Sequence, residues 1–284
     1  MPQPQEFHYR LPQRLAGARP GIHPGSGLGA GADFVTHARL HDRPDPRRLD
    51  LRASLRNLNG EWLVRVHRQN ASIAVHLLVD VSASMAFGAS ASKLEIAARF
   101  AQALGHSTWR ADDALGLVAF DAQPRDDLFL PARRGRGVGD EIASLLRSCE
   151  TRAGGIEGLE QAALRLAGRR GLVFLMSDFH WPLDRLGAVL DRLGPAMVVP
   201  MVVWDPAETE PPADNAIARL RDAETGRLRT LWLRPALRER WRERVAARRD
   251  ELEALFRHHR LRPFLCAGGF EAEAMTRYFL ELQR

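Results

Sequence analysis

The chain has 284 residues, of which 45% are hydrophobic, so it is long enough and apolar enough to bury a sizeable core. No apolar run approaches the roughly 20 residues of a membrane helix. Residues 1–14 contain no apolar signal sequence, so we expect a cytoplasmic protein without a membrane span. The net charge is +6, but Lys93 is the only lysine and the arginines are interleaved with acids along the whole chain. This pattern is typical of a solvated surface and argues against nucleic-acid binding.

The first 69 residues are predicted to form an N-terminal extension that packs on the following domain or leads into it. Residues 21–33, GIHPGSGLGAGAD, resemble a phosphate-binding loop, but no strand precedes them and no helix pattern follows at once, so a flexible loop is expected. The arginine-rich segment 43–56 is interpreted as a surface strap over the sheet or as a region that steers an acidic partner toward the protein. The alternation from Trp62 to Val66 predicts a strand.

Strands and helices alternate through most of residues 72–206. Nearly continuous apolar runs are typical of parallel strands that are covered on both faces, and such runs occupy 72–82, 114–121, 171–179 and 196–205. His76 lies inside the first run and is predicted to be a core residue. A shorter run at 127–132 contains Pro131, which predicts a place near the edge of the sheet. Helices are predicted at 92–109, 138–149, 156–168 and 183–193.

The C-terminal part continues the pattern. Residues 218–233 predict a hairpin that turns around Glu224-Thr225-Gly226, and Pro235 begins a long helix with one apolar stripe. A last strand at 262–267 and a closing helix at 271–282 are expected. The whole pattern predicts an α/β domain over residues 70–284, with a doubly wound, mostly parallel central sheet and helices on both faces.

Two of the predicted strands end in an aspartate beside serines. Asp80, Ser82 and Ser84 follow the first buried strand, and Ser177 and Asp178 end a later one. Because parallel strands end at the same edge of a sheet, these side chains are expected to lie together, where sites form in such folds. Capping of the following helices would explain one such loop. It explains the pair less well, because two carboxylates without a partner repel each other.

A hard divalent cation would resolve this repulsion. Mg²⁺ takes oxygen ligands in near-octahedral geometry and usually keeps several waters. Asp80, Ser82, Ser84 and Asp178 are therefore predicted to hold Mg²⁺, or else Mn²⁺ or Ca²⁺, directly or through water. An open position on the ion would accept an Asp or Glu side chain from a protein partner, which makes recognition directional.

The same residues carry a resemblance to a known family. Asp80-x-Ser82-x-Ser84 resembles the first loop of the metal-ion-dependent adhesion site of von Willebrand factor A domains, and Asp178 in LMSDF matches the third loop. RPDPRRLDLRAS, LVDVSASM, DALGLVAF and LRDAETGRL resemble the bacterial domain of unknown function 58 family, over roughly residues 25–280. The resemblance implies a von Willebrand factor A-like fold and a place among the short, soluble members. It also implies a MoxR-type AAA+ ATPase as partner, in chaperone-like roles that include metalloenzyme maturation.

The second loop departs from the family pattern. The family usually has Gly-Gly-Thr, with the threonine hydroxyl on the metal, whereas this chain has Gly154-Gly155-Ile156. Isoleucine cannot be a ligand, so Thr151 or Glu157 would have to substitute for the threonine. The alternative is a degenerate site, in which case the protein is a scaffold that binds no metal.

Enzyme functions fit the residues less well. A phosphotransferase of the haloacid-dehalogenase type would use Asp80 as nucleophile and need a carboxylate two residues on, where this chain has Ser82. His37 and His41 lack further ligands for a zinc site, and Lys93, at the start of a predicted helix, is interpreted as a surface charge. We therefore expect a non-enzymatic, metal-dependent protein-interaction module that assists a MoxR-type AAA+ ATPase.

Overall fold

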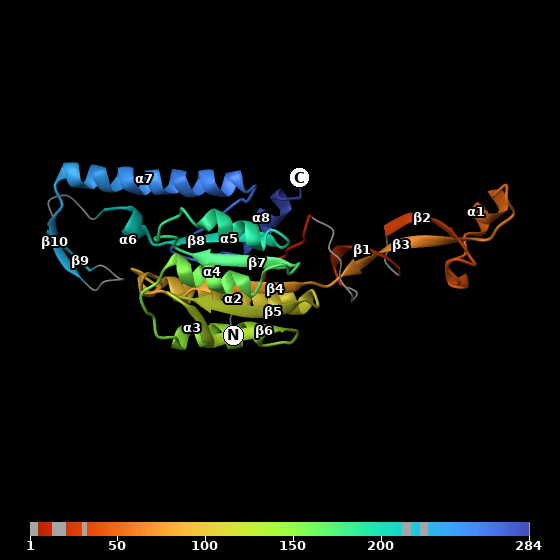
Figure 1. Ribbon diagram of the computed structural model, residues 1–284, viewed down its shortest axis with the longest axis horizontal. Helices are drawn as coiled ribbons and strands as arrows, with labels where there is room; N and C mark the ends of the chain where they lie inside the picture. Colours follow the sequence, from red (N-terminus) through yellow and green to blue (C-terminus); the bar gives the residue numbers. More distant parts are fainter. Residues whose placement is uncertain (1–4, 13–20, 30–32, 212–216, 222–226, 284) are drawn as a thin grey trace. The chain divides into compact units, whose positions relative to one another are not determined.

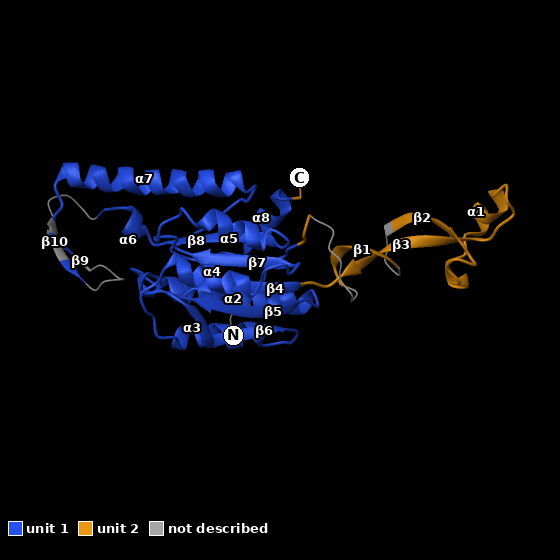
Figure 2. Ribbon diagram, in the orientation of Figure 1, with its two compact units in different colours: residues 1–9, 74–282, 284 blue, residues 10–73, 283 orange. Residues whose placement is uncertain are grey.

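The computed structural model of the protein describes residues 5–12, 21–29, 33–211, 217–221 and 227–283 (Figure 1). The chain divides into two compact units (Figure 2). Residues 1–9 and 74–282 form the larger unit, and residues 10–73 with residue 283 form the smaller one. The division after Ile73 lies shortly beyond the predicted boundary at residue 69, and residues 5–9 belong to the larger unit.

The smaller unit contains a three-stranded antiparallel sheet in which β3 (Leu63–Ala71) lies between β1 (His23–Gly29) and β2 (Asp33–Arg39). The strand predicted from Trp62 is confirmed, whereas the flexible loop predicted over residues 21–33 is wrong for β1. Gly25 supplies the physical reason. A Cβ atom on Gly25 would lie 2.1 Å from the carbonyl oxygen of Gln69, so the glycine allows β1 and β3 to pair at this distance.

The arginine-rich segment 43–56 also belongs to the smaller unit. It contains two short helices, η1 (Pro46–Arg48) and α1 (Leu51–Arg56). Asp50 caps α1 and forms ion pairs with Arg65 (2.7 Å) and His37 (3.1 Å). The hydrogen bond from Arg65 is the largest of the effects that hold the pKa of Asp50 well below its usual range. These ion pairs anchor the segment to its own unit.

A six-stranded sheet with the order β11-β8-β7-β4-β5-β6 forms the centre of the larger unit. All of its strands run parallel except β6, which lies at the edge and is antiparallel to β5. The strands are β4 (Ala74–Asp80), β5 (Ala114–Phe120), β6 (Pro124–Arg133), β7 (Leu172–Ser177), β8 (Met197–Trp204) and β11 (Phe264–Ala267). His76 is buried within β4, as predicted. The predicted fold class, α/β with a mostly parallel sheet, is confirmed.

Helices cover both faces of this sheet (Figure 1). One face carries α2 (Lys93–Arg110), α3 (Val138–Ser148) and α8 (Ala272–Glu281), and the other carries α4 (Ile156–Leu164), α5 (Leu186–Leu193) and α7 (Pro235–His258). On the first face, the ring of Phe100 lies 5.0 Å from that of Phe174 in β7 and 5.8 Å from that of Phe7. On the second face, Leu175 of β7 shares a core with Phe256 of α7. Alternate residues of each strand thus bury against different helices.

The remaining elements follow β8. They are α6 (Pro206–Thr209) and a hairpin of β9 (Ile217–Arg221) and β10 (Leu228–Trp232). The hairpin strands are as predicted, and the turn predicted at residues 224–226 lies outside the described residues. Within the described part of the chain, every helix is too short or too polar to cross a membrane.

Candidate functional site at the carboxyl edge of the sheet

Asp80 is the last residue of β4, and the loop that follows it places two serines beside its carboxylate. The backbone N–H of Ser82 donates to Asp80 Oδ1 (2.9 Å), and the hydroxyl oxygens of Ser82 and Ser84 lie 3.2 Å apart. The short helix η2 (Ala83–Ala86) begins directly after Ser82, so the chain turns within this motif. Asp80 and Ser82 are almost fully buried, and Ser84 is partly exposed.

The end of β7 brings a second group of oxygen atoms to the same place. Ser177 Oγ donates to Asp80 Oδ2 (2.7 Å), and Trp181 Nε1 donates to the same oxygen (3.2 Å). The neighbouring Asp178 is fully buried and accepts a hydrogen bond from Ser84. The structure therefore gathers all four side chains that the sequence suggested as metal ligands.

The backbone turn after Asp178 is held by α7. Phe179 has a φ angle of 52°, in the left-handed region, which costs a residue other than glycine about 1–2 kcal/mol. Arg248 of α7 donates to the carbonyl oxygens of Phe179 (2.6 Å) and Trp181 and so stabilises this turn. The turn allows the backbone N–H of His180 to donate to Asp178 Oδ1 (3.2 Å).

A buried lysine completes the cluster. Lys93 Nζ lies 2.7 Å from Asp178 Oδ2 and 2.6 Å from Glu208 Oε1, and none of the lysine side chain is exposed. The interpretation of Lys93 as a surface charge is therefore wrong. Lys93 is the first residue of α2, and its ammonium lies 6.0 Å from the centre of the Phe87 ring in the loop before the helix. Helical side chains lean toward the N-terminus, which directs this one to the edge of the sheet.

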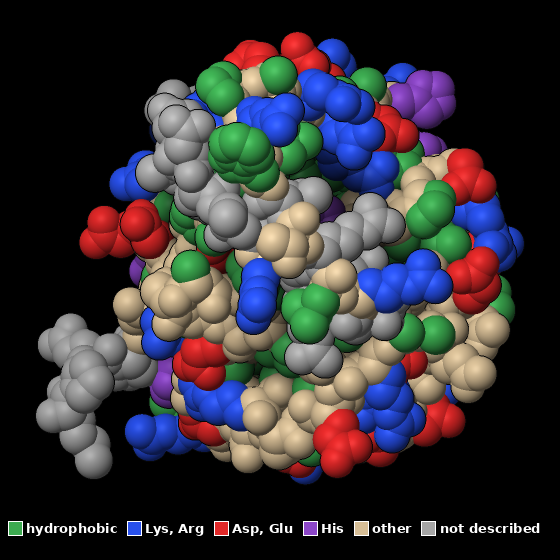
Figure 3. Space-filling model, turned by 90° about the vertical axis from the view of Figure 1, so that its left-hand side faces the viewer, with side chains coloured by type: hydrophobic (Ala, Val, Ile, Leu, Met, Phe, Trp, Pro, Cys, Tyr) green, Lys and Arg blue, Asp and Glu red, His purple; other side chains and the backbone are tan. Residues whose placement is uncertain are grey.

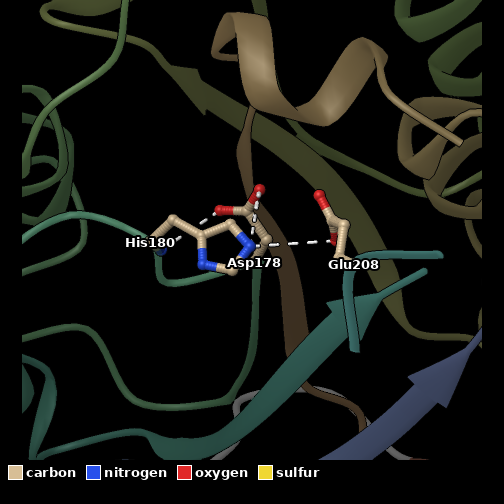
Figure 4. Close-up of side chains that lie close together, drawn as sticks. All are labelled: Asp178, His180 and Glu208. Atoms are coloured by element: carbon tan, nitrogen blue, oxygen red, sulfur yellow. Dashed lines mark hydrogen bonds and ion pairs between the residues drawn. The ribbon is translucent and has the colours of Figure 1, made fainter. Parts of the chain in front are cut away.

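His180 and Glu208 form the partly exposed side of the cluster (Figure 4). His180 Nε2 lies 4.0 Å from Asp178 Oδ2 and 3.8 Å from Glu208 Oε2. The potential ligand atoms of these three residues all lie within 4.8 Å of one another. Neither His180 nor Glu208 was predicted from the sequence. A signal for Glu208 exists, because Asp205 directly follows β8 and forms a capping box with Glu208 at the start of α6.

The two buried aspartates differ in their electrostatic environment. Burial and the negative charge of Asp178 raise the pKa of Asp80 to about 6, against the hydrogen bonds from Ser82 and Ser177. Burial also disfavours the ionised form of Asp178, but electrostatic interaction with His180 and Lys93, together with hydrogen bonds from Lys93 and Ser84, outweighs it and lowers the pKa of Asp178. Asp178 is therefore the carboxyl group of the pair that ionises more readily, and Lys93 is its counter-charge.

Close packing joins the second loop to the first. A Cβ atom on Gly154 would lie 2.2 Å from Ser82 Cβ, so a glycine is needed at this position. The backbone N–H of Ala83 donates to the carbonyl oxygen of Arg152 (2.7 Å), which fixes the loops against each other.

The side chains of the second loop point elsewhere. Ile156 is buried in the core between the sheet and α4, and Glu157 is exposed and forms an ion pair with Arg185 (2.5 Å). Thr151 is partly exposed. Ile156 and Glu157 are thus committed to other contacts, and among the described residues Thr151 makes no hydrogen bond to Asp80 or Asp178.

The oxygen atoms for a Mg²⁺ site are present, but their arrangement does not fit a resident ion. The ammonium of Lys93 already lies against Asp178, and both oxygens of Asp80 already accept hydrogen bonds. A magnesium ion at about 2.0–2.1 Å from Asp178 would lie next to a second positive charge. Mg²⁺ binding by these residues stays a prediction, and both aspartates already have hydrogen-bond or ion-pair partners without it.

Comparison with known proteins places the chain in a family. Residues 43–251 match the family described as "Protein of unknown function DUF58". The chain belongs to this family. Its relatives include the uncharacterized proteins Mb1516 of Mycobacterium bovis and Rv1480 of Mycobacterium tuberculosis, each 28% identical over 250 residues, which cover 86% of this chain and 77% of theirs. The resemblance predicted from the sequence motifs is confirmed at the level of the family.

A shorter relative carries a genomic description. A protein of Paracoccus denitrificans described as "Uncharacterized protein in moxR 3'region" is 34% identical over 98 residues, which cover 34% of this chain and 93% of that one. Among solved structures, the conserved hypothetical protein BatB from Bacteroides thetaiotaomicron has a TM-score of 0.42 and 15% identity, over 74% of this chain and 97% of that one. The proximal thread matrix protein 1 of the mussel byssus, described with a zinc-occupied MIDAS motif, has a TM-score of 0.37 and 17% identity, over 46% of this chain and 38% of that one.

Proposed function

We propose that this DUF58-family chain is a non-enzymatic protein-interaction module that binds an acidic segment of a protein partner beside the Asp178–Lys93 cluster. The observation that carries the proposal is a cavity of about 470 Å³ next to this cluster. His180 and Glu208 belong both to the cluster and to the wall of the cavity, and the facing wall comes from α7. A segment that enters the cavity would therefore contact the outer side of the cluster.

Basic and aromatic side chains line the cavity. Trp204 and Trp241 supply apolar surface, and Arg240 and Arg244 are exposed and four residues apart, so they share one face of α7. Figure 3 views the molecule from the end where α7 begins, and basic side chains gather around that end of the helix. Glu208, an acid in the wall, is already paired with Lys93 (2.6 Å).

This composition favours a partner with carboxylates and apolar side chains. Arginine forms strong, often bidentate hydrogen bonds with carboxylates. Tryptophan and arginine are also the residues that most often dominate binding energy at protein interfaces. An acidic segment with one apolar side chain would satisfy both kinds of wall.

The surroundings of Asp80 support a non-enzymatic role. A phosphotransferase would need this carboxylate free to attack a substrate, with an acid two residues on. Asp80 is instead 1% exposed, its oxygens accept hydrogen bonds from Ser82, Ser177 and Trp181, and the second position is Ser82.

A MoxR-type AAA+ ATPase is the partner that we propose, in the maturation of proteins or metalloenzymes. The relative from Paracoccus denitrificans lies in a moxR 3' region by its description, which supports an association of the two functions. The motif resemblance given above points to the same class of ATPase. The cavity would bind an acidic segment on the ATPase.

The experiment is a calorimetric titration of the purified protein with the MoxR-type ATPase of the same organism. Arg244→Glu is expected to weaken binding at least about tenfold, because it reverses a charge in the cavity wall. Arg257→Glu is the matched control, since Arg257 is exposed on the same helix near its other end, and about twofold change or less is expected.

The same titration separates the alternatives. Absence of binding at about 100 μM of each protein would refute the ATPase as partner. Equal effects of the two charge reversals would refute the cavity as the binding site. The titration is repeated with a metal chelator to test whether the interaction depends on a divalent ion. We expect unchanged affinity, and loss of binding would support the hypothesis that Mg²⁺ bridges the two proteins.

A further inference from the structure

The chain places its only lysine where the charge of the site is concentrated. The side chain of Lys93 is completely buried, and Nζ contacts two carboxylates, Asp178 at 2.7 Å and Glu208 at 2.6 Å. A buried charge is tolerated only when it is paired and hydrogen-bonded. Both conditions are met here, so the ammonium is an integral part of the site.

The surrounding structure is built to hold this cation. Ser92 caps α2 by accepting from the backbone N–H of Glu95 (3.1 Å), and this cap fixes the helical turn that carries Lys93. Glu208 is fixed by the capping box of Asp205, whose other carboxylate oxygen accepts from the backbone N–H of Ala89 (3.0 Å). The two chain segments that supply the lysine and its second carboxylate are thus bonded to each other.

The lysine also joins the network that links the aspartates. Asp178 bonds to Lys93 and to Ser84, and Ser84 lies within 3.2 Å of Ser82, which bonds to Asp80. The positive charge of Lys93 therefore contacts one of the four predicted Mg²⁺ ligands directly and is joined to the other three through hydrogen bonds. A divalent ion bound to Asp178 Oδ2 and Glu208 Oε1 would have to displace this fully buried ammonium.

We propose that the ammonium of Lys93 is the resident cation of this site, that the site is complete without a metal ion, and that removal of Lys93 uncovers a latent site for a transition metal. The latent ligands are Asp178, His180 and Glu208, whose ligand atoms lie within 4.8 Å of one another. Nitrogen and carboxylate oxygen ligands suit Zn²⁺ and Co²⁺. This inference goes beyond the proposed function, because it concerns what neutralises the cluster whether or not a partner binds.

The wild-type protein gives the first test. Protein labelled with ¹³C at the lysine Cε has one lysine signal, which needs no assignment because Lys93 is the only lysine. Addition of MgCl₂ is expected to leave this signal at a position distinct from that of free lysine and to leave the melting temperature unchanged. A saturable shift of the signal toward free lysine would mean that Mg²⁺ displaces the ammonium, and it would overturn the proposal.

The second test uses CoCl₂ and the variant Lys93→Met, which keeps a long apolar stem and removes the charge. Stoichiometric Co²⁺ binding with visible absorption bands is expected for the variant and not for the wild type, after removal of any affinity tag. The control, Lys93→Met with Glu208→Gln, is expected to lose most of this binding. Equal binding by wild type and variant would refute the latent site.

If Lys93→Met does not fold, the proposal can still be refuted, because the lysine signal is measured on the wild-type protein. Failure of the ATPase titration would equally leave both of these tests unchanged. The two proposals therefore fail separately.

Discussion

Replacement of Lys93 by methionine measures how much the buried ion pair contributes to stability. The side chains of Lys93 and Asp178 are 0% and 1% exposed, so the pair is screened very little by solvent. Removing one partner of a buried pair leaves an uncompensated charge and typically costs about 3–5 kcal/mol. Methionine is unbranched like the stem of lysine, so the loss should reflect the charge more than a cavity. We expect Lys93→Met to lower the free energy of unfolding by about this amount.

Urea unfolding of the wild type and the variant provides the measurement, with the slope of the transition checked for constancy. Adding Asp178→Asn to Lys93→Met should recover part of the loss, because the unpaired carboxylate is then gone, and a double-mutant cycle gives the coupling energy. Arg110→Met is the matched control. Its pair with Glu6 has the same 2.7 Å length, but the side chains are 59% and 31% exposed, so about 1 kcal/mol or less is expected. A cost for Lys93→Met no larger than that of Arg110→Met would refute the reasoning.

Three further outcomes are expected. Burial, together with the charge of Arg169, lowers the pKa of His76 to about 4, so the protein loses stability as the pH falls from about 6.5 toward 4. In urea unfolding, the wild type should therefore lose about 2–3 kcal/mol more than His76→Leu between about pH 7 and pH 4.5. Equal losses by the two proteins would contradict this. Gly154→Ala should cost about 1–3 kcal/mol, because its Cβ would lie 2.2 Å from that of Ser82, whereas Gly269→Ala meets nothing within 4 Å and should be near neutral in the same unfolding assay. The wild type should not hydrolyse p-nitrophenyl phosphate with Mg²⁺, and robust turnover that Asp80→Asn abolishes would establish an enzyme instead.

The fold of the larger unit was accessible from the sequence because its strands are long, apolar and separated by amphipathic helices. The order of the strands in space and the antiparallel direction of β6 depend on pairing between distant segments, which no local pattern encodes. Strand β1 was not predicted, for a different reason. Its glycines read as a loop, whereas Gly25 in fact permits close pairing with β3.

The candidate site was predictable in part. The Asp80-x-Ser82-x-Ser84 motif and Asp178 stand at strand ends, so parallel topology alone brings them together. Lys93 was misread because a charged residue at a helix start is usually exposed. Yet lysine is unfavourable near the positive end of a helix dipole, so a single lysine there was a signal that acids lie close by.

Arg248 links α7 by hydrogen bonds to the loop that follows Asp178. Its guanidinium holds two carbonyl groups of the chain between Asp178 and Trp181, and the Trp181 indole in turn donates to Asp80. Any molecule that shifts α7 must either stretch these bonds or carry that stretch of chain along with it. By reciprocity, a ligand of α7 that binds more tightly to one arrangement of residues 178–181 would favour that arrangement by the same factor.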